Sequence, residues 1–107
     1  MAQFDVHANT GQNRAEIPYV VVIQSRRFED ARTRLVAALR AAPRGAVADP
    51  TLTPRFRIEG KAVILDPLQI VAIRQSSLGR LVASLADDTS SSAIINAIDA
   101  VITRAYG

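Results

Sequence analysis

The segment DDTSSSAIINAIDAVITRAY, residues 87–106, decides the fold class of this chain. Its acidic and hydroxyl residues at the start can cap a helix N-terminus, where the helix dipole favours negative charge. Apolar residues then recur at helical spacing, and Ile94, Ile98 and Val101 are expected to hold the helix on a sheet. Ala97 and Ala105 complete the apolar side, and the opposite side carries Ser92, Asn96, Asp99, Thr103 and Tyr106. The segment predicts an amphipathic C-terminal helix with one buried and one exposed side.

Short strands and turns precede this helix. Residues 3–8 alternate, with Phe4 and Val6 on an apolar side and His7 on a side expected to face solvent. Residues 17–24 are apolar and β-branched, which is typical of a strand covered on both faces. Further strands are expected over residues 55–59, 62–66, 68–73 and 81–85, with a turn at Gly60-Lys61 between the first two. The pattern predicts one α+β, mostly β domain over residues 1–107, in which an antiparallel sheet of about five strands is closed by the helix.

Residues 28–39 fit a helix by their spacing alone. Phe28, Ala31, Leu35 and Ala38 recur at helical intervals, and the segment is rich in good helix formers. The stretch that follows is expected to be irregular, because it contains Pro43, Pro50 and Pro54.

The composition excludes several classes of protein. It is 49% hydrophobic and 21% charged, which is typical of a folded domain rather than a disordered chain. The absence of cysteine excludes disulfides and thiolate metal sites, and it suits a cytoplasmic protein. No apolar run reaches the roughly 20 residues of a membrane span, and the N-terminus lacks the features of a signal peptide.

The charge is weakly basic, at a formal +3, and Lys61 is the only lysine beside the arginines. These arginines are scattered along the chain and are not interleaved with aromatic residues. The pattern therefore gives little support to direct nucleic-acid binding, while a basic surface favours an acidic partner.

No catalytic constellation is visible in the sequence. His7 is the only histidine, and the acidic pairs Glu29-Asp30 and Asp87-Asp88 are adjacent residues expected in turns or caps. We therefore expect no enzyme activity, no metal and no cofactor. The alternative is a metal-free endoribonuclease, for which Arg26, Arg27 and His7 are the candidate residues.

Six short segments along the chain are informative when they are taken together and in order: AQFDV (2–6), IPY (17–19), VIQS (22–25), LG (78–79), VASLA (82–86) and IINAID (94–99). Each is only moderately specific, but together they span nearly the whole chain. By these segments and their order, the chain resembles the CcdB family of plasmid and chromosomal toxins.

This resemblance implies both a fold and a function. The family fold is an SH3-like antiparallel sheet with the C-terminal helix packed on it, and residues 34–39 are a strand in it. Members form homodimers and act without a cofactor. They bind the A subunit of DNA gyrase and trap the cleaved-DNA complex, and a cognate antitoxin with an acidic disordered tail neutralises them.

The resemblance places the gyrase-binding residues at the end of the helix. By position in the family motif they are Asp99, Ile102, Thr103, Arg104 and Ala105. Arg104 stands where the family has glycine, so the helix is expected to continue toward Tyr106. Ala105 stands where the family has a large apolar residue. These differences keep two other hypotheses open: an endoribonuclease toxin on a related SH3-like sheet, and a homologue that binds only its antitoxin.

Overall fold

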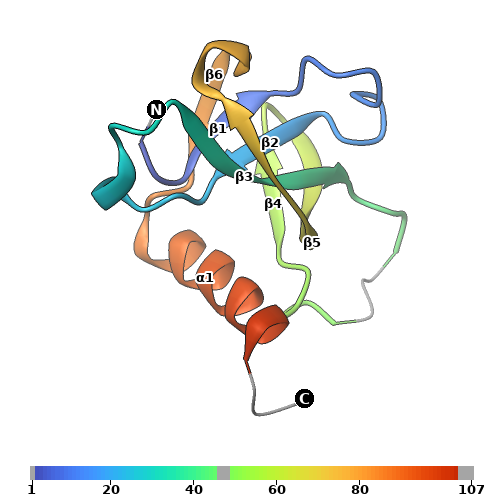
Figure 1. The fold of residues 1–107 in the computed structure, drawn as a ribbon. Coiled ribbons are helices and arrows are strands. Elements are labelled where there is room, and N and C mark those ends of the chain that lie inside the picture. Colours follow the sequence, from blue (N-terminus) through green and yellow to red (C-terminus); the bar gives the residue numbers. More distant parts are fainter. Residues whose placement is uncertain (1, 46–48, 104–107) are drawn as a thin grey trace.

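Six strands and one α-helix form the computed structural model, which describes residues 2–45 and 49–103 (Figure 1). The strands are β1 (Asp5–Ala8), β2 (Tyr19–Val22), β3 (Thr33–Ala41), β4 (Arg55–Ile58), β5 (Lys61–Arg74) and β6 (Leu81–Ser84). Two single turns of 3-10 helix, η1 (Arg26–Phe28) and η2 (Gln75–Ser77), precede β3 and β6, and α1 (Asp88–Ile102) ends the described chain.

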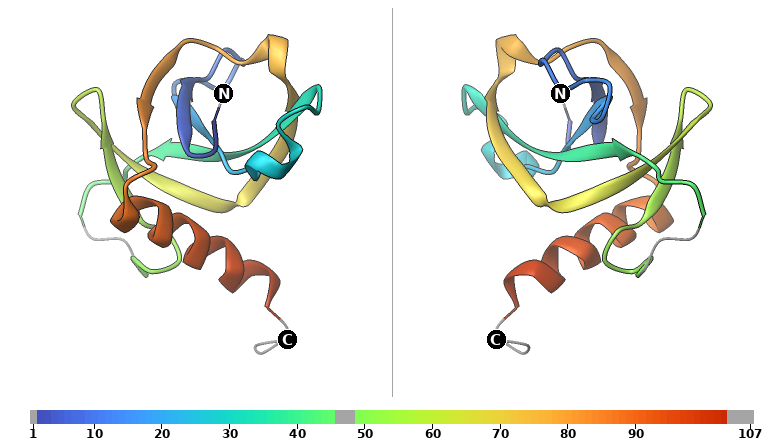
Figure 2. Two further views of the ribbon diagram at one scale, coloured as in Figure 1. Left: turned by 90° about the vertical axis from the view of Figure 1, so that its left-hand side faces the viewer. Right: turned by 90° about the vertical axis from the view of Figure 1, so that its right-hand side faces the viewer.

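The strands form one antiparallel sheet in the order β4-β5-β3-β2-β1-β6. The sheet curls until it is nearly closed, and α1 lies against one side of it (Figure 2). The expected α+β, mostly β class, with an SH3-like sheet and a C-terminal helix, is confirmed. β2 is buried on both faces, as its apolar sequence predicts.

The helix predicted from the spacing of residues 28–39 is wrong, and the strand implied by the family resemblance is confirmed. β3 lies in the middle of the sheet and pairs with β2 on one side, where Leu39 faces Tyr19, and with β5 on the other. These long-range backbone hydrogen bonds outweigh the weak local preference for a helix. Phe28 belongs to η1 instead.

The two strands expected over residues 62–66 and 68–73 are one strand, β5. Pro67 has no N–H group, and the pairing with β3 shifts beside it: Asp66 faces Ala38, whereas Ile70 faces Ala37. Asp66 stabilises the irregular stretch, because its carboxylate accepts hydrogen bonds from the backbone N–H of Leu68 (3.0 Å) and the side chain of Gln69 (2.8 Å).

The predicted hairpin around Gly60 is confirmed, with its turn one residue earlier than expected. Glu59 and Gly60 have positive φ angles of 50° and 78°, the conformation that tight two-residue hairpins require.

The main core lies between α1 and the sheet. Ile94 and Ala97 of α1 are fully buried against strand residues such as Leu39 and Leu65, and Ile98 packs at the edge of this cluster. The expectation that Val101 also holds the helix is wrong, because its side chain is 41% exposed. The C-terminal part of α1 extends beyond the sheet, so it has no surface there to cover (Figure 2).

The expectation that His7 faces solvent is wrong. Its side chain is only 4% exposed, and Nδ1 lies 3.0 Å from the carbonyl oxygen of Gly79. The segment before β6 crosses closely over β1, where a Cβ at position 79 would collide with the carbonyl oxygen of Ala8. Alternation along β1 could not predict this cover, because it comes from a segment about 70 residues away.

Among the described residues, no helix combines the length and the hydrophobicity that a membrane span needs.

Candidate functional site

The N-terminal cap and two buried residues fix the orientation of α1. The Asp87 carboxylate accepts a hydrogen bond of 3.0 Å from the backbone N–H of Ser90, and the hydrogen bonds from Ser90 lower the pKa of this carboxyl. Ile94 and Ala97 then hold the helix against the sheet. The opposite side of α1 is therefore presented to solvent in a fixed direction.

The helix ends at Ile102 and Thr103 is its C-cap, so the expectation that the helix continues toward Tyr106 is wrong. Thr103 has an extended backbone (φ −70°, ψ 138°), and its N–H donates the last helical hydrogen bond to the carbonyl of Asp99 at 2.9 Å. Val101, Ile102 and Thr103 are consecutive β-branched residues, which lower helix propensity where no packing compensates.

Three of the five residues placed at the gyrase-binding position are described, and all three are exposed. Asp99, Ile102 and Thr103 lie together in the last turn, and the Ile102 side chain is 71% exposed. Arg104 and Ala105 lie outside the described residues. An exposed isoleucine beside a carboxylate and a hydroxyl can bind a complementary protein surface, because it combines apolar area with polar contacts that set orientation.

A cavity of about 510 Å³ adjoins this side of the helix. It is lined by Asn96 and Ala100 from α1 and by Asp49, Thr51 and Leu52 from the loop before β4. Asp49 shapes the loop by accepting hydrogen bonds from the hydroxyl of Thr51 (2.6 Å) and its backbone N–H (3.1 Å), which lower the pKa of Asp49. The role of this loop was not predicted from the sequence, although the position of Leu52 between Pro50 and Pro54 indicates a turn with one apolar side chain.

The residues considered for ribonuclease chemistry do not form one site. His7 is buried on β1, whereas Arg26 and Arg27 are exposed on η1. Arg26 lines a cavity of about 40 Å³ together with Arg34, and His7 is not among its lining residues. Within residues 2–45 and 49–103, no group of three or more histidine or acidic residues could hold a metal ion.

Two solved structures share this fold. A mycobacterial endoribonuclease in complex with its cognate antitoxin matches with a TM-score of 0.70 and 11% identity, covering 95% of this chain and 94% of that one. The Mycobacterium tuberculosis toxin MazF-mt6 matches with a TM-score of 0.68 and 14% identity, over 90% and 93% of the two chains. At these identities the likeness shows the fold alone.

The sequence comparisons are more specific. No curated protein matches the chain. The family model described as CcdB protein matches residues 3–104, which is nearly the whole chain. This chain therefore belongs to the CcdB family.

Proposed function

We propose that this protein is a toxin that binds the A subunit of DNA gyrase through the last turn of α1 and traps the cleaved-DNA complex. Membership of the CcdB family supports a toxin of a toxin–antitoxin system. The observation that carries the proposal is the exposure of Asp99, Ile102 and Thr103, the positions that the family resemblance assigns to gyrase. The toxin acts by binding alone, without a catalytic residue, metal or cofactor.

Two further partners belong to this proposal. A cognate antitoxin neutralises the protein, and the antitoxin bound to the endoribonuclease of similar fold supports such a partner. The protein works as a homodimer in the cytoplasm. Large apolar side chains on the strands, those of Leu68, Val71 and Leu81, are exposed in the single chain and offer area that a second copy can cover.

The proposal is tested with purified gyrase. The protein should inhibit supercoiling and produce linear DNA after detergent and protease treatment, because a trapped complex holds cleaved DNA. Ile102→Ser should weaken both effects. Ile95→Ser is the matched control, since Ile95 is also exposed (44%) but lies two turns earlier on α1. Full supercoiling without cleaved DNA at micromolar protein would refute gyrase poisoning.

The fold shared with an endoribonuclease favours one second candidate, a metal-free endoribonuclease. Arg26 and Arg27 are exposed and could contact phosphate, but the buried His7 would have to act from beneath the segment before β6. Incubation of the protein with RNA in the presence of a chelator tests this candidate. Cleavage that disappears in Arg27→Ala would favour it, whereas intact RNA would exclude it.

A further inference from the structure

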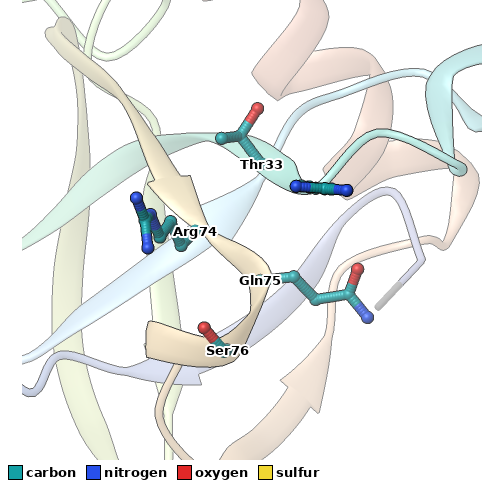
Figure 3. A pocket seen from close by; sticks show the side chains of 5 residues that line it. Thr33, Arg74, Gln75 and Ser76 are labelled. Carbon is teal, nitrogen blue, oxygen red and sulfur yellow. The ribbon is translucent and has the colours of Figure 1, made fainter.

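A cavity at the end of the sheet, where β3 begins and β5 ends, is lined by hydrogen-bond donors. It has a volume of about 660 Å³, and every described side chain in its lining can donate: Arg32, Thr33, Arg74, Gln75 and Ser76. Figure 3 shows the labelled side chains of Thr33, Arg74, Gln75 and Ser76 around the strand ends. Strand pairing brings them together, because Thr33 faces Arg74 and the backbone N–H of Gln75 donates to the carbonyl of Arg32 at 2.8 Å. We call this space the arginine cavity.

The positive charge of the arginine cavity is not neutralised by the described residues. The ion pairs found within residues 2–45 and 49–103 are made by Arg40 and Arg80, not by Arg32 or Arg74. No acidic side chain is among the described residues that line the cavity. A ligand that fits it carries several acceptor oxygens and negative charge in a small volume. Phosphate groups have both properties, and the planar guanidinium group matches their oxygens.

An apolar cavity of about 390 Å³ adjoins the arginine cavity and shares Thr33 with it. Phe28, Leu35 and Ala72 form much of its apolar lining, and Phe28 is 64% exposed. Leu35 faces Ala72 across the two strands, two residues along from the pair of Thr33 and Arg74. The two pairs therefore lie on the same face of the sheet, about 7 Å apart. We call this second space the Phe28 cavity.

The wall of the Phe28 cavity is held in place by the side chain of Gln24. Its amide donates to the carbonyls of Phe28 (2.9 Å) and Thr33 (3.2 Å), and it accepts from the backbone N–H of Leu35 (2.9 Å). These hydrogen bonds fix the loop before β3 before any ligand arrives, which lowers the entropy cost of binding. They also leave an exposed aromatic ring beside an apolar wall, and such a surface favours stacking of a flat ring system.

We propose that the two cavities together bind a free nucleoside triphosphate. Its phosphates occupy the arginine cavity and its base covers Phe28, while the ribose spans the distance of about 7 Å between the two residue pairs. No charged side chain is among the described residues that line the Phe28 cavity, so the next phosphate of a nucleic-acid strand finds no cation there. The inference does not rest on the proposed function, because the described lining of neither cavity includes a residue of α1.

Isothermal titration calorimetry of the full chain tests the proposal with four ligands. These are ATP, adenosine, inorganic triphosphate and an oligonucleotide of four adenylates. ATP should bind at least about tenfold more tightly than adenosine or inorganic triphosphate, because only ATP fills both cavities. ATP should also bind more tightly than the oligonucleotide, whose further phosphates have no cation to contact.

Two variants separate the contributions of the two cavities. Arg32→Gln combined with Arg74→Gln should weaken ATP binding about tenfold or more, toward the affinity of adenosine. Phe28→Ser should weaken it toward the affinity of inorganic triphosphate. Arg14→Gln is the matched control, because it removes an exposed positive charge from another loop and should leave ATP binding unchanged. Thermal melting of each variant establishes that it is folded.

Four results would overturn the proposal: no binding of ATP, equal affinity for ATP and inorganic triphosphate, tighter binding of the oligonucleotide, or equal effects of the cavity variants and the control. The first three concern the unaltered protein, so they decide the matter even if a variant fails to fold. Binding to the gyrase A subunit is measured without nucleotide, so failure of the nucleotide site and failure of gyrase recognition are distinguishable.

Discussion

At the scale of single residues, one polar cluster connects the two edges of the sheet. The Tyr19 hydroxyl donates to Glu59 Oε1 at 2.7 Å, and an Arg80 guanidinium nitrogen lies 3.1 Å from Glu59 Oε2. Glu59 directly follows edge strand β4, and Arg80 directly precedes the other edge strand, β6. The cluster therefore ties together the ends of a sheet that backbone pairing leaves open.

Tyr19→Phe tests the hydrogen bond between Tyr19 and Glu59 and changes the shape of the side chain little. The buried ring stays, but its hydrogen bond to Glu59 is lost, so the free energy of unfolding should fall by about 1 kcal/mol. Urea unfolding followed by circular dichroism measures the change. An unchanged midpoint would show that the hydroxyl contributes nothing to closing the sheet.

Carboxylates with lowered pKa values make the free energy of unfolding depend on pH in the acidic range. Hydrogen bonds from Arg80 and then Tyr19 lower the pKa of Glu59, and hydrogen bonds also lower the pKa of Asp49 and Asp87. A lowered pKa in the folded state gives stability that is present above the usual values, 4.5 for Glu and 3.8 for Asp, and is lost as the pH falls through the folded pKa.

We therefore expect the melting temperature to drop below about pH 4.5, as these groups take up protons. The double variant Glu59→Gln with Asp87→Asn should show a lower melting temperature at pH 7 and a shallower loss in acid. Calorimetry over this pH range measures both effects. An identical acid dependence in wild type and double variant would contradict the assignment.

At the scale of elements, one part of α1 is buried against the sheet, and its C-terminal end is exposed to solvent. Ile94 is fully buried in its first half, so Ile94→Ala should cost about 2–5 kcal/mol of unfolding free energy through lost burial and the cavity left behind. Ile102→Ala, at the exposed end, should change stability by about 0.5 kcal/mol or less. Urea unfolding of both variants compares the two halves, and equal losses would contradict this division.

Some helices and strands could be predicted from the sequence and others could not. The strand β2, the hairpin at Gly60 and the capped start of α1 follow from local signals: a β-branched run, a glycine turn and an acidic cap. β3 could not be predicted from its own spacing, because its conformation is decided by partners on both sides. The register shift beside Pro67, which joins two expected strands into one, is likewise visible only in the pairing.

The candidate site could be predicted only in part, because the sequence shows local signals but not contacts between distant segments. The family motif gives the positions at the end of α1, and helical spacing gives their exposed side. The burial of His7 and the cavity beside Leu52 both depend on segments distant in sequence coming together. Arg32 and Arg74 line one cavity only because β3 pairs with β5, so the spacing of charges along the chain could not predict that they lie close together.

At the scale of the whole molecule, the nearly closed sheet carries α1 on one side, and the last turn of α1 extends beyond the sheet (Figures 1 and 2). This arrangement leaves the last turn accessible to a partner protein, and we propose that it binds the A subunit of gyrase.

The most direct test is the affinity of the purified protein for the isolated A subunit, measured by titration calorimetry for the wild type, Ile102→Ser and Ile95→Ser. We expect the wild type and Ile95→Ser to bind equally, and Ile102→Ser to bind at least about tenfold more weakly, as for a central apolar contact of an interface. Absence of wild-type binding, or equal affinity of all three proteins, would contradict the claim.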